Sequence, residues 1–190
     1  MKLLISMISL SALAILGPVA CSSPQTASDT SGHDTAATLE AVPLGNMRNT
    51  HQLGDVWFGG QPSTEDFALL KAAGVKTIIN LRHDAENEGM VEATVVSATE
   101  MGYIHIPFSG QDQLTDDIFE AVRQELKTAE RPLLLHCASA NRVGATWLPY
   151  RVLDEGVPFE EALREAKEIG LRSPGYEERA RQYIADQQAK

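Results

Sequence analysis

The chain has 190 residues, of which 43% are hydrophobic and 22% charged, and its 16 basic and 26 acidic residues leave a net charge of −10. This length fits one domain with an extension, and the ordinary composition excludes a collagen-like or wholly disordered chain. The negative charge argues against sequence-independent binding of nucleic acid, which needs Lys and Arg to neutralise phosphates. It also argues against docking on an anionic membrane through a basic patch.

Cysteine and histidine are too sparse for a disulfide framework or a metal finger. Cys21 and Cys137 are the only cysteines, so one disulfide at most is possible, and the five histidines show no ligand spacing. The sequence therefore predicts no metal site and no cofactor.

Residues 1–20 have the parts of a secretory signal: a positive start, a short apolar stretch and a helix-breaking Gly-Pro pair. The apolar stretch is shorter than the roughly 20 residues that a membrane span needs. The segment Pro18-Val19-Ala20-Cys21 resembles a bacterial lipoprotein box, although Pro18 stands where an aliphatic residue is usual. The resemblance implies lipidation of Cys21 and an exported chain, lipid-anchored on the periplasmic side of a bacterial membrane. Ser22 after the cysteine favours the outer membrane, and ordinary cleavage to a soluble periplasmic product is the alternative.

The segment 21–46 is rich in Ser, Thr, Ala and Asp and has no periodic apolar pattern. Such a composition buries too little surface to offset chain entropy, so a flexible tether is expected there. The folded domain is then expected over residues 47–190. Either fate of Cys21 leaves Cys137 without a disulfide partner, which indicates a thiol that is either buried and inert or kept for its reactivity.

Short apolar runs alternate with amphipathic stretches along this domain. Strands are expected at 56–58, 75–81, 103–108 and 132–135. Helices are expected at 63–73, with Ser63 and Asp66 as a capping box, at 91–101, at 116–130 after a Thr115 cap, at 141–155, and from Pro158 and Pro174 onward. The alternation predicts an α/β domain with a mainly parallel central sheet flanked by helices.

The chemistry is expected at Cys137, which follows the last predicted strand and precedes a helix. Ligands of open α/β sheets bind beyond the carboxyl ends of the strands. Loop amides and a helix N-terminus there favour an anion and a thiolate. Arg142 adds a planar fork of donors suited to a phosphate-like group. A nucleophile, an anion cradle and an arginine within six residues indicate covalent catalysis on an oxyanion.

The stretch from His136 to Gly144 resembles the signature loop of the cysteine-dependent tyrosine and dual-specificity phosphatases. Two upstream stretches, 58–63 and 70–82, resemble the N-terminal part of compact members of this superfamily, and the resemblance covers residues 52–172. It implies a single phosphatase-like domain whose catalytic loop lies between a strand and a helix. The bacterial relatives include a domain fused to β-lactamase-like hydrolases.

The resemblance also implies roles for particular residues. Cys137 is the expected nucleophile, Arg142 the phosphate ligand, and Asp112 the general acid that protonates the leaving oxygen. His136 is expected to orient the loop, and the substrate-binding residues are expected to be His136, Ala138, Ser139, Ala140 and Asn141. Arg82 and His83 either reach the same rim or lie in a solvated loop.

Two departures leave alternatives open. Four residues separate Cys137 from Arg142, where the phosphatases have five, and Val143 replaces the usual Ser or Thr. A six-residue loop is the length seen in rhodanese-type sulfurtransferases. The first hypothesis is a phosphatase acting through a phosphocysteine on a phosphorylated protein or a small phosphate ester. The alternatives are a sulfurtransferase that uses a sulfur donor and a persulfide, and a non-catalytic domain that binds an anion or a partner.

Overall fold

The computed structural model describes residues 37–87 and 89–190. The predicted signal segment and Cys21 lie outside the described residues. Within these ranges the strands are β1 (Glu40–Ala41), β2 (His51–Leu53), β3 (Val56–Gly59), β4 (Thr77–Asn80), β5 (Gly102–His105) and β6 (Leu133–His136). The α-helices are α1 (Thr64–Ala72), α2 (Glu92–Ser97), α3 (Asp116–Thr128), α4 (Asn141–Leu153), α5 (Phe159–Ile169) and α6 (Pro174–Gln188). Two short 3₁₀ turns, η1 (Asp84–Glu86) and η2 (Gln111–Gln113), lie in loops.

The strands form one mixed sheet in the order β1-β2-β3-β6-β4-β5. Strands β3, β6, β4 and β5 run parallel, and β1 and β2 add an antiparallel edge beside β3. The predicted α/β class and flanking helices are confirmed. Because β6 is central, the segment after it lies beside those that follow β3 and β4, at the edge where ligands of such sheets bind.

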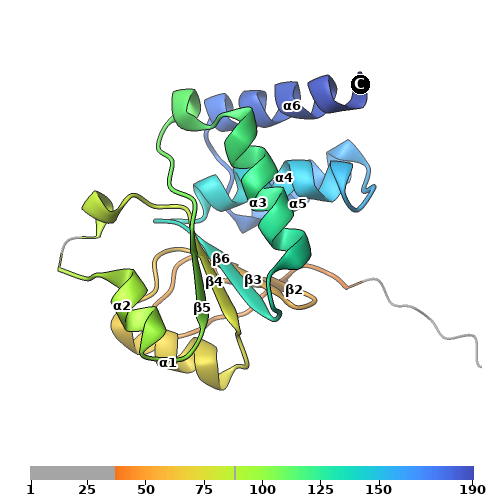
Figure 1. Ribbon diagram of the computed structural model, residues 1–190. Helices are drawn as coiled ribbons and strands as arrows, with labels where there is room; N and C mark the ends of the chain where they lie inside the picture. Colours follow the sequence, from red (N-terminus) through yellow and green to blue (C-terminus); the bar gives the residue numbers. More distant parts are fainter. Residues whose placement is uncertain (1–36, 88) are drawn as a thin grey trace, which may run out of the picture. The chain divides into compact units, whose positions relative to one another are not determined.

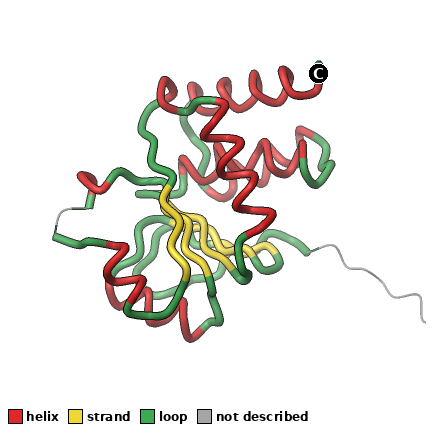
Figure 2. The backbone as a smooth tube through the Cα atoms, in the orientation of Figure 1, coloured by secondary structure: helices red, strands yellow, loops and turns green. Residues whose placement is uncertain are grey.

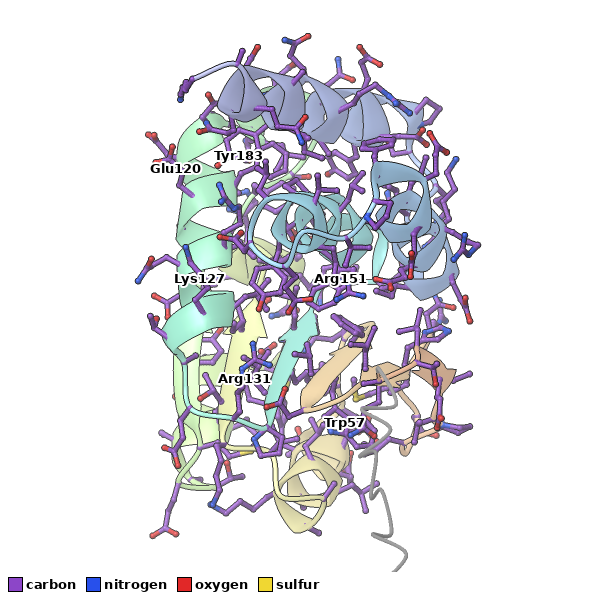
Figure 3. All side chains as sticks on the ribbon, turned by 90° about the vertical axis from the view of Figure 1, so that its right-hand side faces the viewer. Trp57, Glu120, Lys127, Arg131, Arg151 and Tyr183 are labelled. Atoms are coloured by element: carbon purple, nitrogen blue, oxygen red, sulfur yellow. The ribbon has the colours of Figure 1, made fainter. Side chains whose placement is uncertain are left out.

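Two apolar layers hold the helices to the sheet. Helices α3, α4, α5 and α6 cover one face, while α1 and α2 cover the other (Figures 1 and 2). The larger layer is rich in aromatic rings. Tyr183 of α6 lies against α3 (Figure 3) and stacks on Phe119 with 4.5 Å between ring centroids. The sheet thus has one thick and one thin helical cover.

The predictions of where helices begin and end are confirmed in part. The Ser63–Asp66 capping box is confirmed: the Asp66 amide donates to Ser63 Oγ at 3.3 Å, and the Ser63 amide donates to Asp66 Oδ2 at 2.8 Å. Thr115 occupies the N-cap position of α3 but makes no side-chain cap bond. The helix expected at 91–101 is shorter, since the chain reverses at Glu100 with a φ of 60°.

Two strands were not foreseen. Strands β1 and β2 have only two and three residues and no alternating pattern, so the sequence gives no strand signal there. Strand β1 lies within the segment 21–46 that was expected to be a tether, and it pairs with β2. Glu40 and Ala41 are therefore part of the sheet.

Candidate active site

The six-residue loop from Cys137 to Arg142 begins where β6 ends. The Cys137 amide donates to the carbonyl of Gly59, the last residue of β3, at 3.3 Å. The Cys137 side chain is a free thiol with only 1% of its surface exposed, while Ala138 beside it is exposed. The thiol therefore lies at the floor of the loop.

A left-handed residue closes this short loop onto helix α4. Ala140, the N-cap of α4, has a φ of 65°. Behind it lies Gly170, where a Cβ would come within 3.0 Å of Ala140 Cβ and 3.2 Å of the Ser139 carbonyl oxygen. Asn141 Oδ1 accepts the backbone amides of Arg172 and Ser173 at 2.8 and 3.2 Å. The loop is thereby tied to the segment between α5 and α6.

Backbone amides of the loop are available to a ligand because the loop carbonyls bind neighbouring segments. The Ala138 carbonyl accepts the Gln61 amide at 3.4 Å. Because C=O and N–H point in opposite directions across a trans peptide, the Ser139 amide points away from Gln61. The amides of Ser139, Asn141 and Arg142 have no acceptor within the part of the chain that the structure describes. They lie at the N-terminus of the 13-residue helix α4, where anions are favoured.

The guanidinium of Arg142 is 7% exposed and fixed by three segments. Its Nη1 donates to the carbonyls of Leu81 and Phe108 at 3.1 and 2.7 Å. The carboxylate of Glu86 accepts two hydrogen bonds from the end of the guanidinium, with 2.7 Å between Nη1 and Oε1 and 2.6 Å between Nη2 and Oε2. The Nε–H and the second Nη2 hydrogen have no carboxylate or carbonyl acceptor among the described residues, so one side of the fork remains for a ligand.

The charges of Arg142 and Glu86 shift each other's pKa. The hydrogen bond from Arg142, with a further contribution from Arg82, lowers the pKa of Glu86 to about 2. Burial alone would lower the pKa of Arg142, but the bond to Glu86 and the nearby Cys137 side chain outweigh it and raise that pKa. Arg142 therefore stays charged beside the thiol.

Arg82 links Glu86 to the rest of the site. It donates through Nη1 to Gln61 Oε1 at 2.5 Å and through Nη2 to the Glu86 carbonyl. Of the two sequence alternatives for Arg82, the structure selects the rim contact. His83 lies beside Gln113, with 2.9 Å between Nε2 and Oε1.

A buried carboxylate holds His136. Nε2 of His136 lies 2.7 Å from Glu92 Oε1, and the two side chains are 0% and 1% exposed. Gln61 Nε2 donates to the other Glu92 oxygen at 2.7 Å. Burial would raise the pKa of Glu92, yet the bond to His136 and the amide of Gln61 outweigh it and hold that pKa below its ordinary value. His136 is thus anchored immediately before the nucleophile.

The expected general acid, Asp112, belongs to turn η2 and not to the loop itself. Asp112 lies on the exposed turn η2 and lines a cavity of about 340 Å³ with Gly175 and Arg179 of α6. Its carboxylate makes no hydrogen bond or ion pair with another described residue. Turn η2 follows Phe108, whose carbonyl binds Arg142, so the chain connects the turn directly to the site.

The structure adds site residues that sequence reasoning did not single out: Glu86, Glu92, Gln61, Gly170, Arg172 and Asn49, whose Nδ2 donates to the Ser139 carbonyl. The first two lie in a polar loop and at a helix start, where carboxylates are ordinarily solvated. Only the fold brings them to Arg142 and His136. Among residues 37–87 and 89–190 there is no cluster of side chains able to hold a metal ion. The same ranges contain no helix of the length and apolarity needed to cross a membrane.

Comparison with known proteins identifies the family of the chain. Residues 54–151, just over half of the chain, match the family model for the phosphatase-like domain of beta-lactamase hydrolase-like proteins. The Beta-lactamase hydrolase-like protein of Agrobacterium fabrum is 35% identical over 99 residues, which are 50% of this chain and 23% of that protein. The chain thus matches about a quarter of the length of this curated relative.

Solved structures share the fold. TpbA of P. aeruginosa, a cysteine-to-serine variant in complex with phosphotyrosine, has a TM-score of 0.62 at 22% identity, covering 80% of this chain and 90% of its own. The core catalytic domain of the PP-IP phosphatase SIW14 of S. cerevisiae has a TM-score of 0.61 at 18% identity, covering 79% and 92%. At these identities the likeness concerns the fold.

Proposed function

The chain belongs to the family of phosphatase-like domains of beta-lactamase hydrolase-like proteins, and we propose on that premise that it is a cysteine-dependent phosphatase acting on phosphate monoesters. One observation carries the proposal. Cys137 lies beneath the amides of Ser139, Asn141 and Arg142, which lack acceptors among the described residues, and beside the Nε–H side of the Arg142 guanidinium, which no described carboxylate or carbonyl occupies. That arrangement suits a dianionic phosphoryl group above a thiolate.

The proposed reaction has two steps. The Cys137 thiolate attacks phosphorus, the S–P bond forms, and the P–O bond to the leaving group breaks, with a proton from Asp112 passing to the leaving oxygen. A water molecule then gives its proton to Asp112 and attacks phosphorus, and the S–P bond breaks to release phosphate and the thiolate. The free side of the Arg142 fork and the loop amides would hold the phosphoryl oxygens in both steps, where the transition-state charge develops.

The acid role of Asp112 rests on the resemblance of the sequence. It requires η2 to bring the carboxylate toward the leaving oxygen when substrate binds, as catalytic contacts often tighten only in the complex.

The finer proposals are a phosphorylated protein or a small phosphate ester as substrate, and export with lipidation at Cys21. Labelling the chain with a radioactive fatty acid in a bacterial host, with Cys21→Ser as the control, tests the anchor; equal labelling of both chains contradicts it.

The phosphatase proposal is tested by hydrolysis of a generic aryl phosphate. Wild type should turn over, and Cys137→Ser should not. Asp112→Asn should lower kcat by about 10²–10⁴-fold. Asp117→Asn, an exposed aspartate at the start of α3, is the matched control. No turnover by folded wild type contradicts the proposal, and transfer of sulfur from thiosulfate to cyanide by that same protein would establish the sulfurtransferase alternative.

A further inference from the structure

Arginines without a carboxylate partner gather at the catalytic loop. The chain has ten arginines, and seven of them form ion pairs with carboxylates. The other three, Arg48, Arg164 and Arg172, form none with residues 37–87 or 89–190. Arg172 binds Ser139 of the loop, and Arg48 lies next to Gly60, which bridges Ser139. In a chain with a net charge of −10, positive charge is therefore left uncompensated at this rim.

The guanidinium of Arg172 is fixed to the loop. Nη2 donates to the Ser139 carbonyl at 2.9 Å and to Ser139 Oγ at 2.7 Å, while the backbone amide of Arg172 is bound to Asn141. The residue is exposed, and its Nε and Nη1 donate to no other described residue. These donors therefore face solvent from a fixed position beside Ser139, two residues after the nucleophile.

Arg48 lies in the bend between β1 and β2, next to Gly60. Its carbonyl accepts the Gly60 amide at 2.7 Å, and Gly60 forms an isolated β-bridge with Ser139. A Cβ placed on Gly60 would be 3.3 Å from Arg48 Cβ and 3.0 Å from the Ala138 carbonyl oxygen. The side chain of Arg48 thus begins next to the loop, and it too is exposed.

Support of the loop does not require the positive charge of Arg172. The Ser139 carbonyl already accepts a neutral donor, Asn49 Nδ2, at 2.9 Å. An amide at position 172 would supply the same kind of bond, so the loop needs a donor there and not a charge. The charge is better explained by a ligand.

We propose that Arg172, with Arg48, forms a second anion subsite next to the phosphate cradle, and that the substrate carries a second anionic group beside the phosphate to be removed. This group is a carboxylate or phosphate, and it comes either from acidic residues next to a phosphorylated side chain or from a second phosphate on a small ester. The proposal rests on the proposed function, since it names the substrate class of the same site.

The test measures binding to the full chain carrying Cys137→Ser, which does not turn over. Fluorescence anisotropy compares a phosphotyrosine peptide flanked by Asp and Glu with the same peptide flanked by Asn and Gln. Competition then compares a small diol bisphosphate with its monophosphate. Arg172→Gln, which keeps an amide donor for Ser139, and Arg48→Gln are the test variants. Arg164→Gln on α5 removes another exposed charge that forms no ion pair with the described residues, and it is the matched control.

We expect the doubly anionic ligand to bind about five- to tenfold tighter than its singly anionic counterpart at low salt, as one or two exposed charge pairs give. This ratio should fall in Arg172→Gln and in Arg48→Gln, reach about one at about 0.5 M salt, and persist in Arg164→Gln. The ligand pair that shows the preference identifies whether peptide carboxylates or a second phosphate fill the subsite.

The outcomes separate the subsite from the phosphatase activity. A ratio of one in both ligand pairs, or an equal ratio in the Arg172→Gln and Arg164→Gln chains, overturns the subsite. Wild type from the same preparation is assayed for aryl phosphate turnover. Turnover without a preference overturns only the subsite, while a preference without turnover contradicts the phosphatase and leaves the anion subsite standing. If no phosphorylated ligand binds, both proposals are overturned.

Discussion

The carboxylate of Glu86 should decide how well Arg142 binds a phosphoryl group. Glu86 holds two of the guanidinium nitrogens at 2.7 and 2.6 Å, and only the carbonyls of Leu81 and Phe108 would remain without it. A hydrogen bond to a charged group contributes about 1.5–3 kcal/mol. Because the Glu86 side chain is 29% exposed, each of its two hydrogen bonds to Arg142 contributes at the lower end of this range. Together they contribute about 3 kcal/mol to the fixed orientation of the guanidinium.

Glu86→Ala should therefore loosen the guanidinium and lower kcat/KM on an aryl phosphate by about 100-fold, the size of effect that a displacement of about 1 Å can have. Glu86→Gln keeps one neutral acceptor and should lose about tenfold, half of that effect in free energy. Steady-state kinetics at pH 7 measure both, and thermal unfolding shows that the variants are folded.

The matched control for this prediction is Glu177→Gln. Glu177 is 25% exposed and also paired with two cations, Lys167 and Arg181, but it lies on α6. Wild-type kcat/KM in folded Glu86→Ala would refute the orienting role. Tighter binding of inorganic phosphate by that variant would show instead that Glu86 competes with the ligand for Arg142.

Two further predictions concern the carboxylates of the site. Glu86 and Glu92 have lowered pKa values in the folded chain, so their contribution to stability is present above about pH 4.5 and should be lost as the pH falls through the folded-state values, which for Glu86 is about 2. Urea unfolding between pH 5 and pH 2 measures this loss of stability. If the free energy of unfolding falls equally steeply with pH in Glu86→Gln and in wild type, the prediction for Glu86 is contradicted. Glu92→Ala leaves His136 buried without its partner and should lower the free energy of unfolding by about 3–5 kcal/mol. A change below about 1 kcal/mol would show that the pair is not the anchor of His136.

The sequence was sufficient for the main elements because each had a strong local signal. The run 75–81 is rich in aliphatic residues and contains β4, and Ser63 and Asp66 form the capping box they resemble. Strands β1 and β2 were missed because two or three half-buried residues have no detectable period, and their pairing partner lies elsewhere in the chain. Edge strands of this kind are defined by the sheet they join.

The candidate site divides in the same way. Cys137 and Arg142 lie in one contiguous loop, so their spacing could be recognised from the sequence and the structure brings them together. Glu86, Glu92 and Gln61 lie on other segments, 76 residues or fewer before Cys137, and join it only because β3, β4 and β6 end side by side. Local patterns contain no information on such long-range pairings. Asp112 was placed by its distance along the chain from the nucleophile, and the Asp112→Asn measurement decides its role.

The shortened loop depends on a glycine behind it, and this leads to a last prediction. Gly170 has a φ of 147°, and a Cβ there would meet Ala140 and the Ser139 carbonyl at 3.0–3.2 Å. Gly74 also has a positive φ, 88°, but a Cβ there would meet nothing within 4 Å. Substitution by Ala should cost about 1–3 kcal/mol of backbone strain at either position, whereas only Gly170→Ala should also push the loop away from its position. We expect Gly170→Ala to lower kcat/KM by about tenfold or more, and Gly74→Ala to lower the melting temperature while keeping wild-type kcat/KM. Equal kcat/KM in the two folded variants would mean that the loop from Cys137 to Arg142 keeps its conformation without support from Gly170. The hydrogen bonds from the Arg172 and Ser173 amides to Asn141 would then be sufficient to hold it.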